Sequence, residues 1–281
     1  MDRPLGVGAA LLTVLATFVG GQLSGAATAV LVALAIVVAR GGSAVHTLRD
    51  ADTLTSDPLF VSIAALTAGL TLVLATFVAL RIVRVPFRAG TALRGARAAH
   101  IALALLLVLA AGPFADLAIQ AFRAAFPGVT LGLLESIGEA AQTNGPRLLV
   151  LLVCVSLVPG IAEEIFFRGL VQRSLTARLG APLGIGLASV LFGAFHVDPP
   201  QAIGAAVLGL ALGFVVWRTG SVVPAVVAHA ANNALALAVA RQPVEPATGT
   251  GPSQVWVLGV SGAIAALAVA ALVRTTPRQT A

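Results

Sequence analysis

The chain has 281 residues, of which 58% are hydrophobic and 10% are charged, and its formal net charge is +6. Soluble domains carry about 25% charged residues, so a surface this poor in charge would not stay dispersed in water. The composition excludes an ordinary soluble enzyme, a nucleic-acid-binding protein and a disordered chain. We therefore expect an integral membrane protein that contacts membrane lipids and binds no nucleic acid.

Apolar runs near the length of about 20 residues that a spanning helix needs recur along the chain. They lie at 59–80, 99–120, 147–170, 183–197, 201–217, 222–240 and 254–273, after a longer apolar region that covers 5–19 and 26–39. Because Gly20, Gly21 and Gly25 offer a turn inside that first region, we expect two short helices there. The predicted fold class is all-α, a polytopic membrane protein with about eight transmembrane helices.

Arginine supplies all seventeen basic residues, and five of them crowd the segment 81–98. Positively charged loops stay on the cytoplasmic side of a membrane, so we expect this segment to be cytoplasmic. Counting spans onward places Arg178, Arg218 and Arg274 on the same side, with a cytoplasmic C-terminus in a bacterial plasma membrane. The side of the N-terminus depends on whether the first region holds one span or two, and a cleaved signal peptide is a further interpretation of it.

The two parts of the chain differ in their polar residues. Residues 1–98 are predicted to be scaffold helices followed by the cytoplasmic Arg-rich loop, because their apolar runs hold no acid or histidine. Residues 99–281 hold the remaining transmembrane helices, and at about 147–240 these helices carry ionisable side chains. Such groups cost at least about 2.5–3.5 kcal/mol each at membrane depth, so they mark candidate functional residues.

Spacing indicates how these side chains are arranged. Glu164 and Arg168 are four residues apart on one helix face, in the favourable order for an ion pair. Glu163 is rotated by about 100° from Glu164 and stays free for another role. His229 and Asn233 are also four apart and can point into one cavity.

The expected depths of Glu163 and His196 in the membrane support a single site. Glu163 lies fifteen residues before Arg178, and His196 lies fourteen residues after Pro182, so both are expected at a similar distance from the turn between their helices. Pro159 lies four residues before Glu163 and is expected to kink the helix and open room for water.

Three motifs follow one another on successive helices. Residues 163–168 read E-E-I-F-F-R, residues 192–196 read F-G-A-F-H, and residues 229–233 read H-A-A-N-N. In this order they resemble the CAAX prenyl protease 2 and bacteriocin-processing (CPBP, or Abi) family of intramembrane proteases, over about residues 147–240. The resemblance implies an intramembrane endopeptidase that cleaves a membrane-anchored or hydrophobic peptide or protein.

The resemblance also implies a role for each motif residue. Glu163 and His196 would activate the attacking water. His229 and Asn233 would polarise the carbonyl of the scissile bond and stabilise its oxyanion.

The resemblance says less about the roles of Glu164 and Arg168 and about whether the enzyme needs a metal. Glu164 and Arg168 would support the site, although a purely structural ion pair is an alternative. If the enzyme depends on zinc, Glu163, His196 and His229 are the candidate ligands. A metal-free mechanism based on glutamate is equally compatible with the sequence.

Two other functions stay open at the level of the residues. A non-catalytic membrane scaffold of the same fold would keep these residues for packing alone. A proton- or ion-coupled transporter would use acids and histidines as a relay, although the halves of the chain show no repeat.

Overall fold

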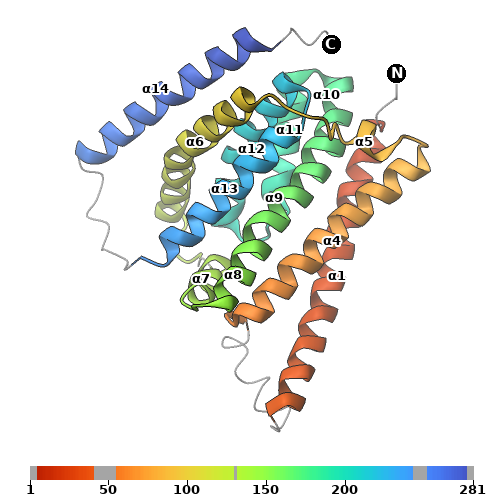
Figure 1. Ribbon diagram of the computed structural model, residues 1–281, viewed down its shortest axis with the longest axis vertical. Helices are drawn as coiled ribbons and strands as arrows, with labels where there is room; N and C mark the ends of the chain where they lie inside the picture. The colour runs from red at the N-terminus through yellow and green to blue at the C-terminus, as the bar shows by residue number, and fades with distance from the viewer. Residues whose placement is uncertain (1–4, 41–54, 130–131, 243–251, 277–281) are drawn as a thin grey trace.

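The computed structural model describes residues 5–40, 55–129, 132–242 and 252–276, which form a bundle of helices (Figure 1). Seven helical segments in this part of the chain are long and apolar enough to cross a membrane, and the apolar helix α11 (Ala181–Ala194) is shorter. No strand occurs among the described residues. The all-α, polytopic fold class is confirmed, and the chain is an integral membrane protein.

Most spanning helices are uninterrupted. They are α1 (Val7–Arg40), α4 (Pro58–Ile82), α6 (Ala98–Ala125), α12 (Pro199–Thr219), α13 (Val223–Ala240) and α14 (Pro252–Thr275). Two short helices lie in the connections, α5 (Phe87–Gly90) and α7 (Gly132–Ala140). The starts of α4 and α12 follow the sequence signals closely, since Asp57 and Asp198 cap them through their carboxylates and proline comes next.

The helix between Pro146 and Leu179 changes its winding along its length. Its five consecutive pieces are α8 (Pro146–Leu152), η1 (Val153–Leu157), α9 (Val158–Glu163), η2 (Glu164–Gln172) and α10 (Arg173–Leu179). The pieces η1 and η2 are π-helical, a winding that is rare and occurs frequently at functional sites. The helix extends nine residues beyond the predicted run 147–170.

The prediction of two short N-terminal helices is wrong. Residues Val7–Arg40 form the single helix α1, which passes through Gly20, Gly21 and Gly25 without a break. In a bilayer, backbone groups find no water, so a continuous helix that satisfies its own hydrogen bonds is favoured over a turn. Because α1 is one helix, the N-terminal end of α1 lies at the same end of the bundle as the C-terminal end of α14 (Figure 1).

The predicted span 183–197 is also corrected. The helix α11 stops at Ala194, and His196 lies in the turn that leads directly into α12. Fourteen residues of α-helix cover about 21 Å, less than the hydrocarbon thickness of about 30 Å. The helix α11 is therefore shorter than a full span, whereas α12, which starts directly after the turn, has 21 residues and is long enough to cross.

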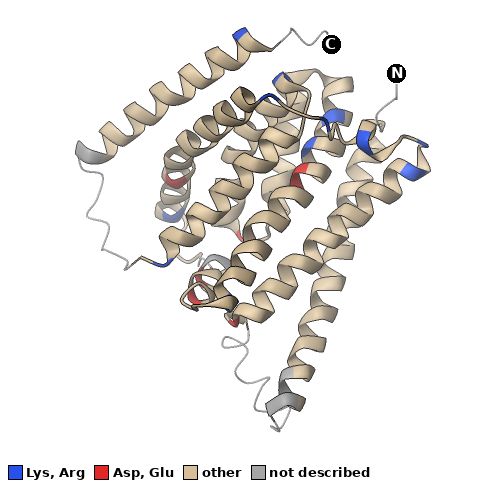
Figure 2. Cartoon of the chain, in the orientation of Figure 1, with Lys and Arg blue, Asp and Glu red and all other residues tan. Residues whose placement is uncertain are grey.

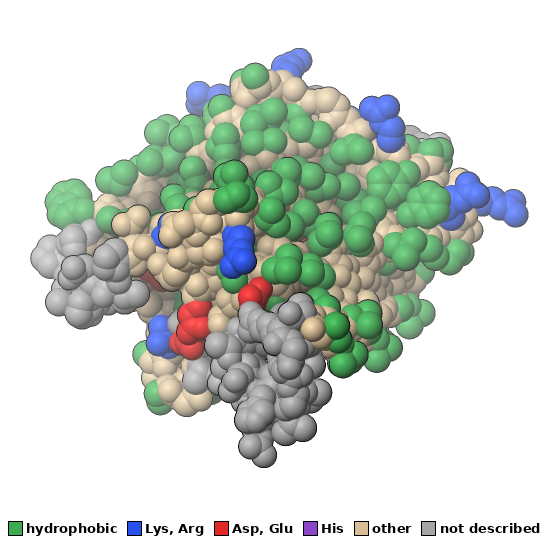
Figure 3. Space-filling model, turned by 60° about the horizontal axis from the view of Figure 1, so that its bottom comes forward, with side chains coloured by type: hydrophobic (Ala, Val, Ile, Leu, Met, Phe, Trp, Pro, Cys, Tyr) green, Lys and Arg blue, Asp and Glu red, His purple; other side chains and the backbone are tan. Residues whose placement is uncertain are grey.

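Basic side chains gather at one end of the bundle. Figure 2 shows most of them at the end where both termini are marked, with acidic side chains in the middle and at the opposite end. We call this end the Arg-rich end; it comprises 81–98, 173–182, 218–222 and 274–276. Hydrophobic side chains cover most of the flank seen in Figure 3, as expected for a surface that faces lipid.

The helix between Pro146 and Leu179, which we call the central helix, packs against the surrounding helices through an apolar core. Phe166 and Phe167 on η2 are completely buried in one apolar cluster with Leu72 of α4 and Phe192 of α11. The N-terminal helices thus pack directly on the segment that carries the paired glutamates. This packing fixes η2 from the apolar side and leaves its polar side facing α12 and α13.

Candidate active site

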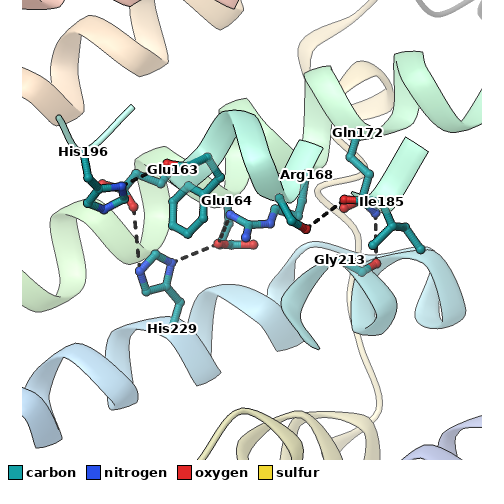
Figure 4. Close-up of polar contacts among 10 residues, drawn as sticks. Glu163, Glu164, Arg168, Gln172, Ile185, His196, Gly213 and His229 are labelled. Carbon is teal, nitrogen blue, oxygen red and sulfur yellow. Dashed lines mark hydrogen bonds and ion pairs between the residues drawn. The ribbon is translucent and has the colours of Figure 1, made fainter. Parts of the chain in front are cut away.

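Glu164 and Arg168 form a buried ion pair on the polar side of η2 (Figure 4). The Nη1 group of Arg168 donates to Oε1 of Glu164 over 2.8 Å, and the two side chains are 1% and 0% exposed. The guanidinium also lies over the ring of Phe192, with Cζ 4.1 Å from the ring centroid. The spacing of four residues therefore produces the pair that the sequence predicts, and the aromatic face adds a second favourable contact to the charge.

His229 connects this pair to Glu163. Its Nδ1 lies 2.9 Å from Oε1 of Glu164. Because a carboxylate paired with Arg168 is ionised and only accepts, Nδ1 carries a proton and donates. The other ring nitrogen, Nε2, lies 3.7 Å from Oε2 of Glu163. One imidazole on α13 thus lies between two glutamates on the central helix.

Glu163 differs from its neighbour in its surroundings. Its side chain is 18% exposed, whereas that of Glu164 is fully enclosed. No described side chain or backbone group donates a hydrogen bond to the buried Oε2 of Glu163. A carboxylate oxygen without a donor can accept the proton of a water molecule or of a substrate group.

His196 contacts Phe192, which also contacts His229 and Arg168. Its Nδ1 lies 2.9 Å from the carbonyl oxygen of Phe192. A carbonyl only accepts, so Nδ1 donates, and Nε2 of the neutral ring is left as an acceptor. The ring of Phe192 contacts both imidazoles edge-on, with centroids 5.0 Å from His196 and 5.8 Å from His229.

Asn233 lies one turn beyond His229 on α13. Its Nδ2 group is 3.5 Å from the carbonyl oxygen of Val155 in the π-helix η1, and the residue is partly exposed. The contacts found among the described residues therefore place Asn233 against η1 rather than against the glutamates.

Local backbone features explain how these side chains converge. Pro159 lies at the start of α9, directly after η1, where a proline removes a backbone donor and disturbs regular α-winding. Gly160 lets α13 approach closely, since a Cβ at this position would lie 3.0 Å from the backbone nitrogen of Ala230. The residue before Ala230 is His229, so this close approach places the imidazole beside the glutamates.

Sequence reasoning missed Gln172, which extends the polar side of η2 by one more turn. Gln172 is 2% exposed, and its Nε2 donates to the carbonyl oxygen of Gly213 over 2.9 Å. Gly209 and Gly213 on α12 leave the space that Arg168 and Gln172 occupy, because a Cβ at either glycine would lie within 3.2 Å of these side chains. The position of Gln172, four residues after Arg168 on the same helix, is the sequence signal that could have revealed this residue.

The candidate zinc ligands do not assemble into a complete set. A catalytic zinc ion takes three protein ligands and one water. The described residues contain no group of three His, Cys, Asp or Glu side chains that could hold a metal. Glu163 and His229 face each other, whereas His196 is not gathered with them, so this arrangement offers two ligands rather than three.

Comparison with known proteins finds a family match for the central part of the chain. Residues 145–235 match the family model described as Rce1-like, type II CAAX prenyl endopeptidase. No curated protein and no solved structure matches the chain. The matched stretch begins just before α8 and ends on α13, so it contains all three motifs and the whole contact network described above. The segment 145–235 of this integral membrane protein is therefore similar to the type II CAAX prenyl endopeptidases, which confirms the resemblance that the motifs predicted.

Proposed function

We propose that the protein is an intramembrane endopeptidase that hydrolyses a peptide bond of a membrane-anchored or hydrophobic substrate. The observation that carries the proposal is the pair of neighbouring glutamates with opposite surroundings. Glu164 is fully enclosed and its Oε1 is bonded to Arg168 and His229, while Glu163 is 18% exposed and lies 3.7 Å from Nε2 of His229. Amide hydrolysis needs both a base for water and fixed groups around it.

In the proposed reaction, Glu163 takes a proton from a water molecule as the water oxygen attacks the carbonyl carbon of the scissile bond. The Nε2 acceptor of His196 helps to orient that water. The protonated carboxyl of Glu163 then gives its proton to the leaving amine, which restores the carboxylate and releases both products.

The oxyanion of the tetrahedral intermediate would lie near α13. In the proposal His229 acts as an imidazolium, so that Nδ1–H donates to Glu164 and Nε2–H, which faces Glu163, donates to the oxyanion. Asn233, on the same face of α13, supplies an amide donor once it leaves the carbonyl of Val155. Donors fixed before the reaction stabilise developing charge most effectively where water is excluded.

Reconstituted protein tests the proposal directly. Wild type, Glu163→Gln and the control Glu139→Gln are placed in liposomes with a pool of prenylated, lipidated and plain peptides, and products are read by mass spectrometry. Glu139 is an exposed carboxylate on α7 outside the site. Loss of a general base lowers the rate by about 10²- to 10⁴-fold, so Glu163→Gln should abolish detectable cleavage and Glu139→Gln should keep it. Equal products from all three proteins would remove Glu163 from the reaction.

Metal removal forms a separate prediction. Since the described ligand set offers two of the three ligands that catalytic zinc takes, we expect cleavage to survive dialysis against a strong chelator. Metal content by elemental analysis and the cleavage rate should be measured on the same sample. A rate that falls with the metal and returns on adding zinc would contradict a metal-free mechanism.

A further inference from the structure

A short segment at the Arg-rich end, residues 89–94, passes beside the helix that carries the paired glutamates. We call this segment the strap. The Nη1 group of Arg173, the first residue of α10, donates to the carbonyl oxygens of Ala89 and Gly90 over 2.6 and 2.7 Å. The strap is therefore bonded to the direct continuation of η2.

Close packing strengthens the same contact. Gly169 of η2 has no side chain where the strap passes, and a Cβ there would lie 2.8 Å from the carbonyl oxygen of Thr91. Thr91 is itself 0% exposed. The strap thus lies directly on the glutamate-bearing helix, one residue beyond Arg168.

The other side of the strap is bonded to the start of α13, the helix that carries His229. Ser221 donates through Oγ to the carbonyl oxygen of Arg94 over 2.7 Å. The backbone N–H of Val222 donates to the carbonyl oxygen of Ala92 over 3.2 Å. Ala92 has a φ of 53°, a left-handed conformation that a non-glycine residue adopts only when its contacts enforce it. The strap therefore bridges the two helices whose side chains meet in the candidate active site.

The surface around the strap is strongly basic. Between Asp57 and Asp116 the sequence has no acidic residue. Five exposed arginines lie in the same stretch, which are Arg81, Arg84, Arg88, Arg94 and Arg97. Exposed apolar side chains adjoin them, with Ile82 75% exposed. Arginines next to an apolar membrane-level surface fit the phosphate groups of anionic lipids.

We propose that anionic phospholipid headgroups bind the basic surface of residues 81–97 and thereby hold the strap against both catalytic helices. Since the strap is bonded to the glutamate-bearing helix and to α13, headgroup binding fixes the separation of Glu164 and His229. The binding itself is independent of the proposed protease function, whereas its effect on cleavage rests on that function.

Binding is tested by thermal unfolding in neutral detergent, with phosphatidylglycerol or phosphatidylcholine added. The variant Arg88→Gln with Arg94→Gln removes two charges and leaves the strap's backbone hydrogen bonds in place. The matched control, Arg123→Gln with Arg147→Gln, removes two exposed charges at the opposite end. Phosphatidylglycerol should raise the Tm of wild type and control by several degrees more than phosphatidylcholine does, and the strap variant should lose most of this difference. Equal shifts in all three proteins would overturn the proposal.

Coupling is tested by cleavage in vesicles of phosphatidylglycerol or phosphatidylcholine. Wild type should cleave several-fold faster in phosphatidylglycerol, and the strap variant should cleave at similar rates in both. Ser221→Ala removes the side-chain bond to Arg94, one of the two bonds between α13 and the strap, and should reduce the rate difference while keeping the Tm shift. Equal wild-type cleavage rates in the two kinds of vesicle would refute the coupling. The Tm result on lipid binding stands even if the protein proves not to be a protease. If replacing Arg88 and Arg94 affects cleavage of acidic peptides only, with no change in the Tm shift, the surface binds substrate and the lipid proposal is wrong.

Discussion

Two neighbouring glutamates have different chemistry because of what surrounds each one. Glu164 shares one oxygen between the guanidinium of Arg168 and the imidazole of His229, and its side chain has no access to solvent. Among the described residues, the ion-pair partner of Glu163 is the more distant Nε2 of His229, at 3.7 Å. The enclosed carboxylate is suited to hold other groups in place, and the partly open one is suited to exchange protons.

The ion pair makes a specific prediction about stability. Arg168→Met keeps much of the side-chain volume but leaves the carboxylate of Glu164 enclosed without its cation. Removing one partner of a buried pair costs about 3–5 kcal/mol. We expect a clearly lower Tm for this variant in detergent, measured by intrinsic fluorescence, together with loss of cleavage.

The matched comparison for that prediction is Glu163→Gln. This side chain is partly exposed and has no ion pair shorter than 3.7 Å among the described residues. Its Tm should stay close to that of wild type, although its cleavage is lost. Similar Tm values for the two variants would show that the pair of Glu164 and Arg168 contributes little to the fold.

Local spacing predicted the contact between Glu164 and Arg168, but it did not predict contacts between helices. The pair of Glu164 and Arg168 follows from a separation of four residues on one helix, which sequence alone reveals. The ring of Phe192 over Arg168 depends on how α11 packs against η2, and the sequence gives no signal for that packing. The same holds for Gln172 and its bond to Gly213, because the partner lies 41 residues away.

At the scale of elements, the distance between α9 and α13 determines whether the motifs meet. Gly160 faces Ala230, with backbone atoms so close that a Cβ would lie 3.0 Å from the nitrogen and 3.1 Å from Cα. Backbone atoms cannot rotate out of the way as a side chain can. Any side chain at position 160 must therefore separate the two helices and move His229 away from the glutamates.

Gly160→Ala is expected to lower cleavage more than it lowers stability. Overpacking costs about 1–3 kcal/mol, partly offset by the better helix propensity of alanine, which is worth about 1 kcal/mol. The control is Gly186→Ala on α11, where a Cβ would meet nothing within 4 Å. Cleavage rate and Tm should be measured for both. Full activity in Gly160→Ala would show that the close approach does not position His229.

Two helix starts coincide with local signals in the sequence. The caps at Asp57 and Asp198 and the prolines after them mark helix starts that the structure keeps. Hydropathy alone could not separate one long helix from two short ones over Val7–Arg40, because glycine permits a turn without requiring it. Nor could hydropathy predict the π-helical pieces η1 and η2, because it does not distinguish π-winding from α-winding.

At the scale of the whole molecule, the course of α1 and the distribution of arginine both bear on how the bundle is oriented in the membrane. The Arg-rich end contains the strap, the start of α11 and the ends of α12 and α14, which Arg218 joins by donating to Val273 and Thr276. The opposite end carries fewer arginines, and acidic residues of α7 lie near it. The start of α1 and the end of α14 lie at the same end of the bundle, and the excess of arginine at this end predicts that it is cytoplasmic.

Cysteine labelling in intact cells tests this orientation. The chain has one cysteine, so Cys154→Ser gives a background without thiols. Into it are placed Ala177→Cys on α10, at the Arg-rich end, or Ala125→Cys at the end of α6, at the opposite end; both alanines are exposed. A membrane-impermeant maleimide should label Ala125→Cys in whole cells and reach Ala177→Cys only after lysis. The reverse pattern would place the arginines outside, and the headgroups that meet the strap would then belong to the outer leaflet.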